Sequence, residues 1–124
     1  MKLTPNLISE REFKNSIVAL ARDLGWLVHH DLPSQRANGS WATATQGDSG
    51  FPDLVLVHPG NMVTGLKPMV VFAELKTQRG KTTASQEQWL TALRACGQMA
   101  FVWRPAQMQE IQELLFGTFT HPSS

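Results

Sequence analysis

Two short apolar runs constrain the fold of this chain more than any other feature of its sequence. They cover residues 54–58, with the sequence LVLVH, and residues 69–76, with the sequence MVVFAELK. Runs of this kind, separated by a Pro-Gly-Asn turn signal, are typical of buried strands. We expect them to form an antiparallel hairpin in which His58 pairs with Met69, a register that the intervening loop is able to shift.

The charged residues at the ends of these runs have no use in an ordinary hairpin. Antiparallel pairing keeps the sum of paired residue numbers constant, so this register places Asp53 opposite Glu74, with Cβ atoms about 5 Å apart. Because side chains alternate along a strand, Glu74 and Lys76 share one face. Two facing carboxylates repel each other, and this costs stability unless a positive charge offsets it.

Two sources of positive charge fit this position. The first is Lys76, in which case the group is only a carboxylate–lysine ion pair at a sheet edge. The second, which we favour, is a hard divalent cation, because Mg²⁺ takes one or two carboxylates together with waters and phosphate oxygens. Such an ion activates a water and neutralises charge on a phosphodiester. Lys76 would then orient or deprotonate that water, or stabilise the charge that develops on the phosphorane.

Capping residues, glycines and apolar periodicity delimit the other elements. Three helices are expected, bounded by Ser9 and Gly25, by Thr83 and Gly97, and by Pro105 at the start of the last. Strands are expected at residues 26–30, 54–58, 69–76 and 99–103. The order is α-β-β-β-α-β-α with a parallel crossover before the last strand. The fold class is therefore α/β, a mixed sheet flanked by helices, with a long loop at residues 31–50.

The composition favours one folded domain in a reducing compartment. The chain has 124 residues, a hydrophobic fraction of 42% and one cysteine, so it forms neither an internal disulfide nor a Cys-rich zinc site. It lacks an apolar run of the roughly 18 residues that a membrane helix needs and an N-terminal secretory signal, so we expect a cytoplasmic protein without a membrane partner. The formal net charge is only +1, so binding to nucleic acid requires a local basic patch.

Candidate DNA-binding residues lie in two segments. Lys76, Arg79 and Lys81 fall within six positions of one another, although a solvated turn explains the same cluster. Trp41 in the long loop lies near Arg36 and has the chemistry to stack on an unpaired base. Packing of the loop onto the sheet explains Trp41 equally well, so both interpretations stay open.

The ordered set of motifs resembles the core of the PD-(D/E)xK nuclease superfamily. The set comprises G-x-P-D at residues 50–53, E-x-K at residues 74–76, Gly80, Gln86 at the start of a helix, and the strand sequence MAFVWRP. The fuller match is to the VRR-NUC branch, the virus-type replication-repair nucleases. The segment LGWLVHH after the first helix is similar to small stand-alone members from phages and bacteria. The resemblance spans about residues 9–116 and implies a restriction-endonuclease-like core.

By this resemblance, the chain is a metal-dependent DNA endonuclease that uses Mg²⁺ or Mn²⁺ and no organic cofactor. Asp53, Glu74 and the backbone carbonyl of Leu75 would bind the metal, and Lys76 would be the catalytic lysine. Members of the superfamily often complete the site with an acidic residue of the first helix.

Three further residues have competing interpretations. Glu12 fits the place of the helix carboxylate best because it flanks the apolar stripe, but it is also the N3 member of a capping box, and Glu10 is close enough to leave the assignment open. Gln86 lies on an apolar helix face and needs a partner, so we expect it to hold a water or Lys76, with helix capping as the alternative. Cys96 has no paired base and is expected to be an inert core residue.

The resemblance also implies a biological setting. Compact members resemble Holliday junction resolvases, so we expect a homodimer that cuts branched, forked or four-way DNA, in DNA repair, within a bacterium or a phage-infected host. One nuclease domain is expected over residues 1–124, with a core at about 9–116 and a flexible tail at 117–124. The alternatives are a restriction- or nicking-type nuclease, an RNA nuclease, and a non-catalytic DNA-binding or assembly subunit with the same fold.

Overall fold

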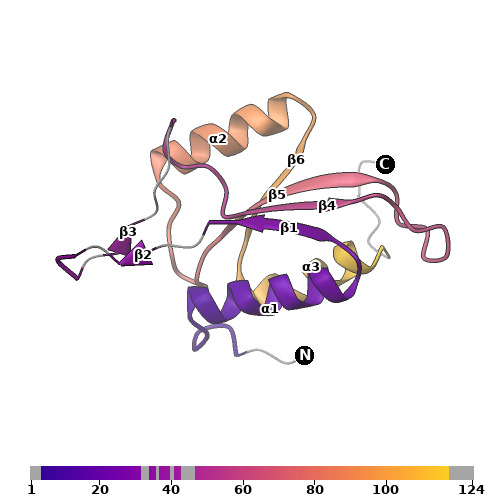
Figure 1. Ribbon diagram of the computed structural model, residues 1–124, viewed down its shortest axis with the longest axis horizontal. Coiled ribbons are helices and arrows are strands. Elements are labelled where there is room, and N and C mark those ends of the chain that lie inside the picture. The colour runs from indigo at the N-terminus through magenta and orange to yellow at the C-terminus, as the bar shows by residue number, and fades with distance from the viewer. Residues whose placement is uncertain (1–3, 32–33, 36, 40, 43–46, 118–124) are drawn as a thin grey trace.

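A computed structural model of the chain describes residues 4–31, 34–35, 37–39, 41–42 and 47–117, with the side chains of residues 34, 35, 41 and 42 excepted. A four-stranded mixed sheet forms the middle layer, with α1 and α3 on one face and α2 on the other (Figure 1). The helices are α1 (Glu10–Asp23), α2 (Ala84–Ala95), the 3-10 turn η1 (Pro105–Gln107) and α3 (Met108–Phe116). The strands of this sheet are β1 (Leu27–His30), β4 (Leu54–His58), β5 (Met69–Leu75) and β6 (Met99–Trp103). This is the α/β fold that the sequence predicts.

The central hairpin has the expected register. β4 and β5 are antiparallel, with His58 paired to Met69 and Leu54 paired to Ala73. β5 and β6 are parallel, and α2 supplies the crossover that a parallel pair requires. The sheet order β1-β4-β5-β6 therefore places the hairpin in the middle and leaves β1 and β6 as its edges.

Local signals explain where the helices begin. The Ser9 side chain accepts a hydrogen bond from the Glu12 N–H at the start of α1. Thr83 and Gln86 form a reciprocal capping box at the start of α2. Pro105 opens the last helical segment, whose first turn is the 3-10 helix η1. All three helix starts agree with the sequence, because capping depends on residues that are close along the chain.

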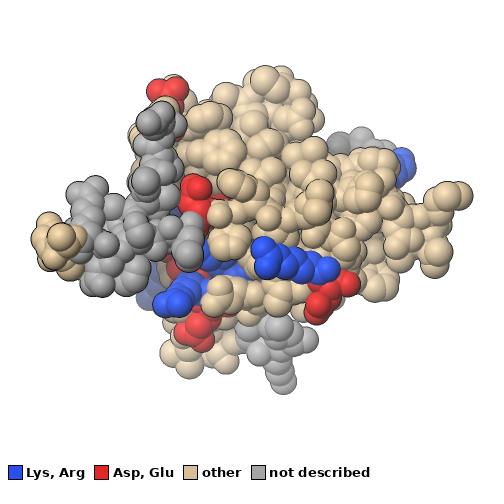
Figure 2. Space-filling model, in the orientation of Figure 1, with Lys and Arg blue, Asp and Glu red and all other residues tan. Residues whose placement is uncertain are grey.

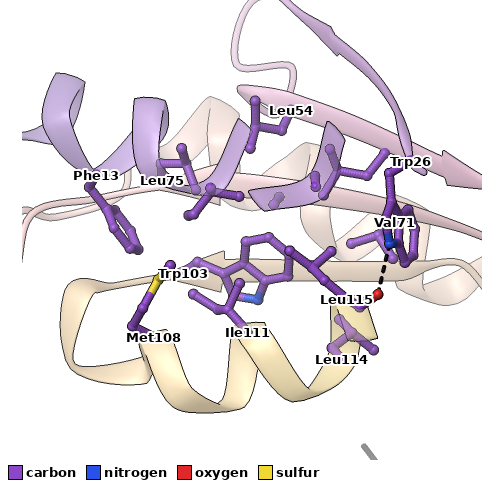
Figure 3. Close-up of a cluster of buried hydrophobic side chains, with 14 of the residues drawn as sticks. Phe13, Trp26, Leu54, Val71, Leu75, Trp103, Met108, Ile111, Leu114 and Leu115 are labelled. Atoms are coloured by element: carbon purple, nitrogen blue, oxygen red, sulfur yellow. Dashed lines mark hydrogen bonds between the residues drawn. The ribbon is translucent and has the colours of Figure 1, made fainter. Parts of the chain in front are cut away.

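One face of the sheet carries the hydrophobic core (Figure 3). Phe13 of α1 and Ile111 and Leu115 of α3 are at most 1% exposed and pack against the strands. The Trp26 indole N–H donates to the Leu115 carbonyl at 2.9 Å, which ties α3 to the segment before β1. On the opposite face α2 buries only Leu90, so that side of the sheet is more thinly covered.

Three features differ from the sequence prediction or fall outside it. The long loop contains the short strands β2 (Ser34–Gln35) and β3 (Trp41–Ala42), whose length of two residues gives no period to recognise. Cys96 is exposed, so its predicted place in the core is wrong; it is the C-cap of α2 and faces solvent. Residues 118–124, most of the predicted tail, lie outside the described residues. In the part of the chain that the structure describes, no helix is long and apolar enough to cross a bilayer.

Candidate active site

Several strand ends and helix starts meet at one end of the sheet. β4 runs antiparallel to β5, and β6 runs parallel to β5, so the start of β4 lies beside the ends of β5 and β6. In Figure 1 this is the left end of the sheet, where α1 and α2 also begin. The observed register, continued by one residue, places Asp53 opposite Glu74.

Asp53 is fixed by the end of β5 and by the glycine that precedes it. Its Oδ2 accepts a hydrogen bond from the Leu75 N–H at 2.8 Å. Gly50 has φ +94°, and a Cβ at this position would come within 2.7 Å of backbone atoms of Ser85 and Gln86. The G-x-P-D turn therefore packs directly on the start of α2, and only glycine permits both the conformation and the close approach.

Aromatic packing holds the same turn from the side. The Phe51 ring lies nearly perpendicular to Phe72, at 6.2 Å between centroids, and to Trp89, at 5.0 Å. The Trp89 indole N–H donates to the Ser49 carbonyl at 3.0 Å. Contacts from β5 and α2 thus place the segment that carries Asp53.

Glu74 is almost completely buried, with 1% of its surface exposed. Its Oε1 accepts a hydrogen bond from Gln86 Nε2 at 3.0 Å and lies 4.0 Å from Lys76 Nζ. Its Oε2 is buried and has no hydrogen-bond partner among the described residues. A buried carboxylate oxygen without a partner is costly, and the neighbouring Asp53 carboxyl can pair with it only while the two groups share a proton; the fully ionised pair therefore needs a further ligand.

The electrostatics of the site favour a further positive charge. Burial and the neighbouring Asp53 carboxyl raise the pKa of Glu74 from 4.5 to about 9, while Lys76 opposes the shift. Partial burial and Asp53 also raise the pKa of Glu10, against the lowering effect of Lys76 and Lys14. Lys76 alone therefore does not neutralise the acidic groups, and protein atoms by themselves keep Glu74 protonated at neutral pH.

The geometry favours Glu10 over Glu12 as the helix carboxylate near this pair. Glu10 and Glu12 are both exposed, but Glu12 Oε1 accepts a hydrogen bond from Ser9 Oγ at 2.9 Å, so this side chain lies at the helix cap, although no bond from the Ser9 N–H completes a capping box among the described residues. Residues two positions apart point about 200° apart around a helix, so Glu10 is directed elsewhere. Glu10 interacts electrostatically with Asp53 and Glu74. Of the two carboxylates that the sequence left open, the geometry therefore favours Glu10, and the role of either residue in the site stays a prediction.

Gln86 combines the two interpretations that the sequence left open. Its Oε1 accepts the Thr83 N–H at 2.9 Å, and Thr83 Oγ1 accepts the Gln86 N–H at 3.2 Å, which completes the capping box. Its Nε2 binds Glu74, whereas the sequence led us to expect a water or Lys76. One side chain thus links the start of α2 to the orientation of the buried carboxylate.

The predicted DNA-binding residues are described only in part. Arg79 and Lys81 are exposed in the turn that follows β5. Arg36 and the side chain of Trp41 lie outside the described residues, so their predicted role stays a prediction. Figure 2 shows acidic and basic side chains side by side from the lower left to the lower middle of the view, whereas its upper middle and right parts are largely uncharged.

Arg104 was not singled out by the sequence. Its Nη1 donates to the carbonyls of Thr77 and Gly80 at 2.8 and 2.6 Å, and it therefore holds the turn that carries the exposed basic residues. The residue lies within the strand motif MAFVWRP, but its target is three-dimensional. A local pattern does not reveal an arginine whose partners are carbonyls more than 20 positions away.

The ligand atoms at this end of the sheet fit a hard divalent cation. Carboxylate oxygens from Asp53, Glu74 and Glu10 are the type that Mg²⁺ and Mn²⁺ prefer, and Glu74 Oε2 is unpaired. Within the described residues, no three His, Cys, Asp or Glu side chains form a preassembled metal cluster. Mg²⁺ needs only one or two carboxylates beside waters and phosphate oxygens, so the facing pair is sufficient. The part of the Leu75 carbonyl stays a prediction.

The fold and this arrangement of an acidic pair and a lysine define the class as a PD-(D/E)xK-like nuclease fold. The family model of the VRR-NUC domain, which describes the sequences of that family, matches residues 10–107, and this is most of the chain. The chain therefore belongs to the VRR-NUC family and carries a nuclease domain, which implies DNA as its substrate. No curated protein and no solved structure shows significant similarity to it.

Proposed function

We propose that this chain is a divalent-metal-dependent endonuclease that hydrolyses DNA phosphodiester bonds. The observation that carries the proposal is the state of Glu74, which is buried opposite Asp53 with one oxygen unpaired. A carboxylate with a purely structural role would find partners for both oxygens. The burial and the facing carboxylate are instead compatible with a bound cation.

The chain supplies each group that this chemistry needs. Asp53 and Glu74 would hold Mg²⁺ or Mn²⁺ together with the Leu75 carbonyl, and Glu10, which interacts electrostatically with both carboxyls, would support the site. When bound there, such an ion would supply a nucleophilic water and would neutralise charge on the phosphodiester. The Leu75 N–H orients Asp53, as described above.

Gln86 and Lys76 would act on the protein side of the reaction. Gln86 holds Glu74 Oε1 in place at 3.0 Å, which fixes the direction of the other oxygen. The Lys76 ammonium group, on the same strand face and 15% exposed, would donate to a water or to a phosphate oxygen. We therefore propose that Gln86 orients the Glu74 carboxylate and that Lys76 transfers a proton or stabilises charge.

We further propose that the substrate is branched, forked or four-way DNA and that the active form is a homodimer. Family resemblance to junction-resolving nucleases supports both, and the setting would be DNA repair in the cytoplasm of a bacterium or a phage-infected host. The chain has one cysteine and therefore no Cys-based zinc finger with which to read a sequence. This favours recognition of DNA structure over DNA sequence.

A cleavage assay tests the proposal. Linear duplex, single-stranded, forked and four-way DNA would be incubated with Mg²⁺, Mn²⁺ or EDTA, with an RNA substrate as a further arm. We expect metal-dependent cleavage that is fastest on branched DNA and is abolished by Asp53→Ala and by Lys76→Ala while both variants stay folded. Strong cleavage in EDTA, or by both variants, would overturn the mechanism.

Two other outcomes would change the assignment. DNA binding without cleavage in every metal would favour a non-catalytic subunit, and preferred cleavage of RNA would change the substrate class. Sedimentation at several protein concentrations would test the homodimer, and a strict monomer would contradict the analogy with junction resolvases.

A further inference from the structure

One arginine side chain donates hydrogen bonds to several backbone carbonyl groups of the turn after β5. Arg104, directly after β6, donates from Nη1 to the carbonyls of Thr77 at 2.8 Å and Gly80 at 2.6 Å, with a longer contact of 3.5 Å to that of Gln78. The Gly80 N–H donates to the Thr77 carbonyl at 3.2 Å and closes the turn. Three carbonyls of one short turn thus face the same guanidinium.

Peptide geometry fixes the direction of the N–H groups that follow these carbonyls. All peptide bonds of the described residues are trans, and across a trans peptide the C=O and the next N–H point in opposite directions. The N–H groups of Gln78, Arg79 and Lys81 therefore point away from Arg104. In the described part of the chain, none of these three N–H groups donates a hydrogen bond.

A second set of hydrogen bonds braces the turn against the corner that follows β6. Gln78 Oε1 accepts the Ala106 N–H at 3.0 Å. Gln107 Oε1 accepts the N–H of Arg104 itself at 2.8 Å. Hydrogen bonds therefore fix the turn both through its backbone carbonyls and through the side chain of Gln78. They keep the N–H groups that point away from Arg104 in a defined direction.

The turn borders a hollow and carries exposed positive charge. The hollow, of about 330 Å³, is lined by Asn6, Thr77, Gln78 and Arg79. The side chains of Arg79 and Lys81 are exposed. Outward backbone N–H groups of a turn, together with cationic side chains, bind phosphate oxygens.

We propose that the turn at residues 77–81 binds a backbone phosphate of the DNA through these N–H groups and through Arg79 and Lys81. Arg104 is then a positioning residue that orients the turn without touching DNA. The inference rests on the proposed function for the identity of the ligand as DNA. Because the turn begins directly after Lys76, the phosphate that it binds lies near the one that is cut, and it sets the register of the strand in the site.

DNA binding in the absence of cleavage tests this inference. The affinity of the protein for a fluorescent forked DNA would be measured in EDTA, or in Ca²⁺ if EDTA prevents binding, at several salt concentrations. Variants would be Arg79→Ala, Arg104→Ala, Arg104→Lys and the control Arg94→Ala. Arg94 is a matched control because it also donates to a backbone carbonyl, that of Ala100 at 2.9 Å, near the end of α2.

The variants differ in the salt dependence that we expect. Arg79→Ala weakens binding and lowers the slope of log affinity against log salt by about one, because a phosphate contact is lost. Arg104→Ala and Arg104→Lys weaken binding by roughly tenfold with the slope unchanged, because orientation is lost and no phosphate contact is lost. Arg94→Ala binds DNA as the unchanged protein does.

Other results would overturn the inference. A slope lowered by one in Arg104→Ala, with binding restored in Arg104→Lys, would mean that Arg104 itself contacts phosphate. Unchanged affinity in the Arg79 and Arg104 variants would exclude this turn as a phosphate site. If an Arg104 variant does not fold, Gln78→Ala removes only the outer brace and should weaken binding a few-fold, and unchanged affinity there would count against the inference. Failure of the unchanged protein to bind any DNA would contradict the proposed function instead.

Discussion

His58 and Glu74 are the buried polar side chains of the described part of the chain, and they lie at opposite ends of one hairpin. His58 has partners on both ring nitrogens, because Nε2 lies 3.1 Å from the Leu24 carbonyl and Nδ1 accepts the Gly60 N–H at 2.9 Å. The Nδ1 bond makes Nε2 the protonated nitrogen. The edge of the ring also packs against Trp26 at 5.2 Å.

Glu74 differs from His58 because one of its two carboxylate oxygens has no hydrogen-bond partner among the described residues. One oxygen is bound by Gln86, and the other is buried without a partner and near a second carboxylate. A buried polar group with all partners in place stabilises a fold, whereas a half-satisfied one is retained at a cost. We therefore infer that His58, at one end of the hairpin, has a structural role and that Glu74, at the other end, has a functional role. Variants at both ends test this inference.

The largest effect is expected at the functional end. Glu74→Gln removes the charge at nearly constant shape, so we expect DNA cleavage to fall by roughly a thousandfold while the protein stays folded. Single-turnover cleavage in Mn²⁺ measures the rate, and circular dichroism checks the fold. A variant that cuts as fast as the unchanged protein would remove Glu74 from the mechanism.

The two acidic residues of the first helical turn form a matched pair for the next largest effect. Glu10→Gln is expected to lower the cleavage rate by roughly 10- to 100-fold, the usual cost of losing a group that supports a metal site. Glu12→Gln should change the rate little and lower the free energy of unfolding by at most about 1 kcal/mol, through its hydrogen bond with the Ser9 hydroxyl at the helix cap. The same cleavage assay measures the rate of each variant, and urea unfolding measures its stability. Loss of cleavage in Glu12→Gln with normal cleavage in Glu10→Gln would favour Glu12 as the site residue.

At the structural end, His58→Ala is expected to lower the free energy of unfolding by roughly 3 kcal/mol. The substitution leaves the Leu24 carbonyl and the Gly60 N–H without their partner and opens space beside Trp26. Urea unfolding measures the loss, and cleavage at low temperature, where the variant is folded, should be nearly unchanged. Normal stability with lost cleavage would break the comparison between the two ends.

The pH dependence of stability in EDTA gives the most gradual effect. The folded protein raises the pKa of Glu74 from 4.5 to about 9, so between these values the folded state keeps a proton that the unfolded chain has released. Its contribution to stability is complete below pH 4.5 and is lost as the pH rises toward 9, at no more than about 1.4 kcal/mol per pH unit for this proton. The raised pKa of Glu10 acts in the same direction. Urea unfolding at pH 5, 6, 7 and 8 should show this decline, and Glu74→Gln should flatten it; identical profiles for the two proteins would contradict the raised pKa.

Local sequence signals were sufficient for much of the fold. The helix starts at Ser9 and Thr83 follow from capping residues, and the pairing of Asp53 with Glu74 follows from constant register in a hairpin. The short strands β2 and β3 could not be predicted, because two residues carry no periodicity. The exposed position of Cys96 depends on how α2 sits on the sheet, which its own sequence does not encode.

The site was predictable where its residues are strand neighbours and less so where they come from separate elements. Glu10 and Glu12 are both acidic and both in the first helical turn, so only the rotation of α1 against the sheet distinguishes them. Gln86 was recognised as needing a partner, but the partner depends on how α2 meets β5. Arg104 gave no signal because it binds carbonyls, which every residue has.

Thermal or chemical unfolding at pH 8 with and without Mn²⁺ tests the central claim most directly, which is that the unpaired carboxylate at Glu74 belongs to a divalent-cation site. The unchanged protein should gain about 2.7 kcal/mol at a Mn²⁺ concentration one hundred times the dissociation constant. Glu74→Gln should be at least as stable as the unchanged protein in EDTA and should gain little from Mn²⁺. Equal stabilisation of both proteins by Mn²⁺, or no stabilisation of either, would contradict the account.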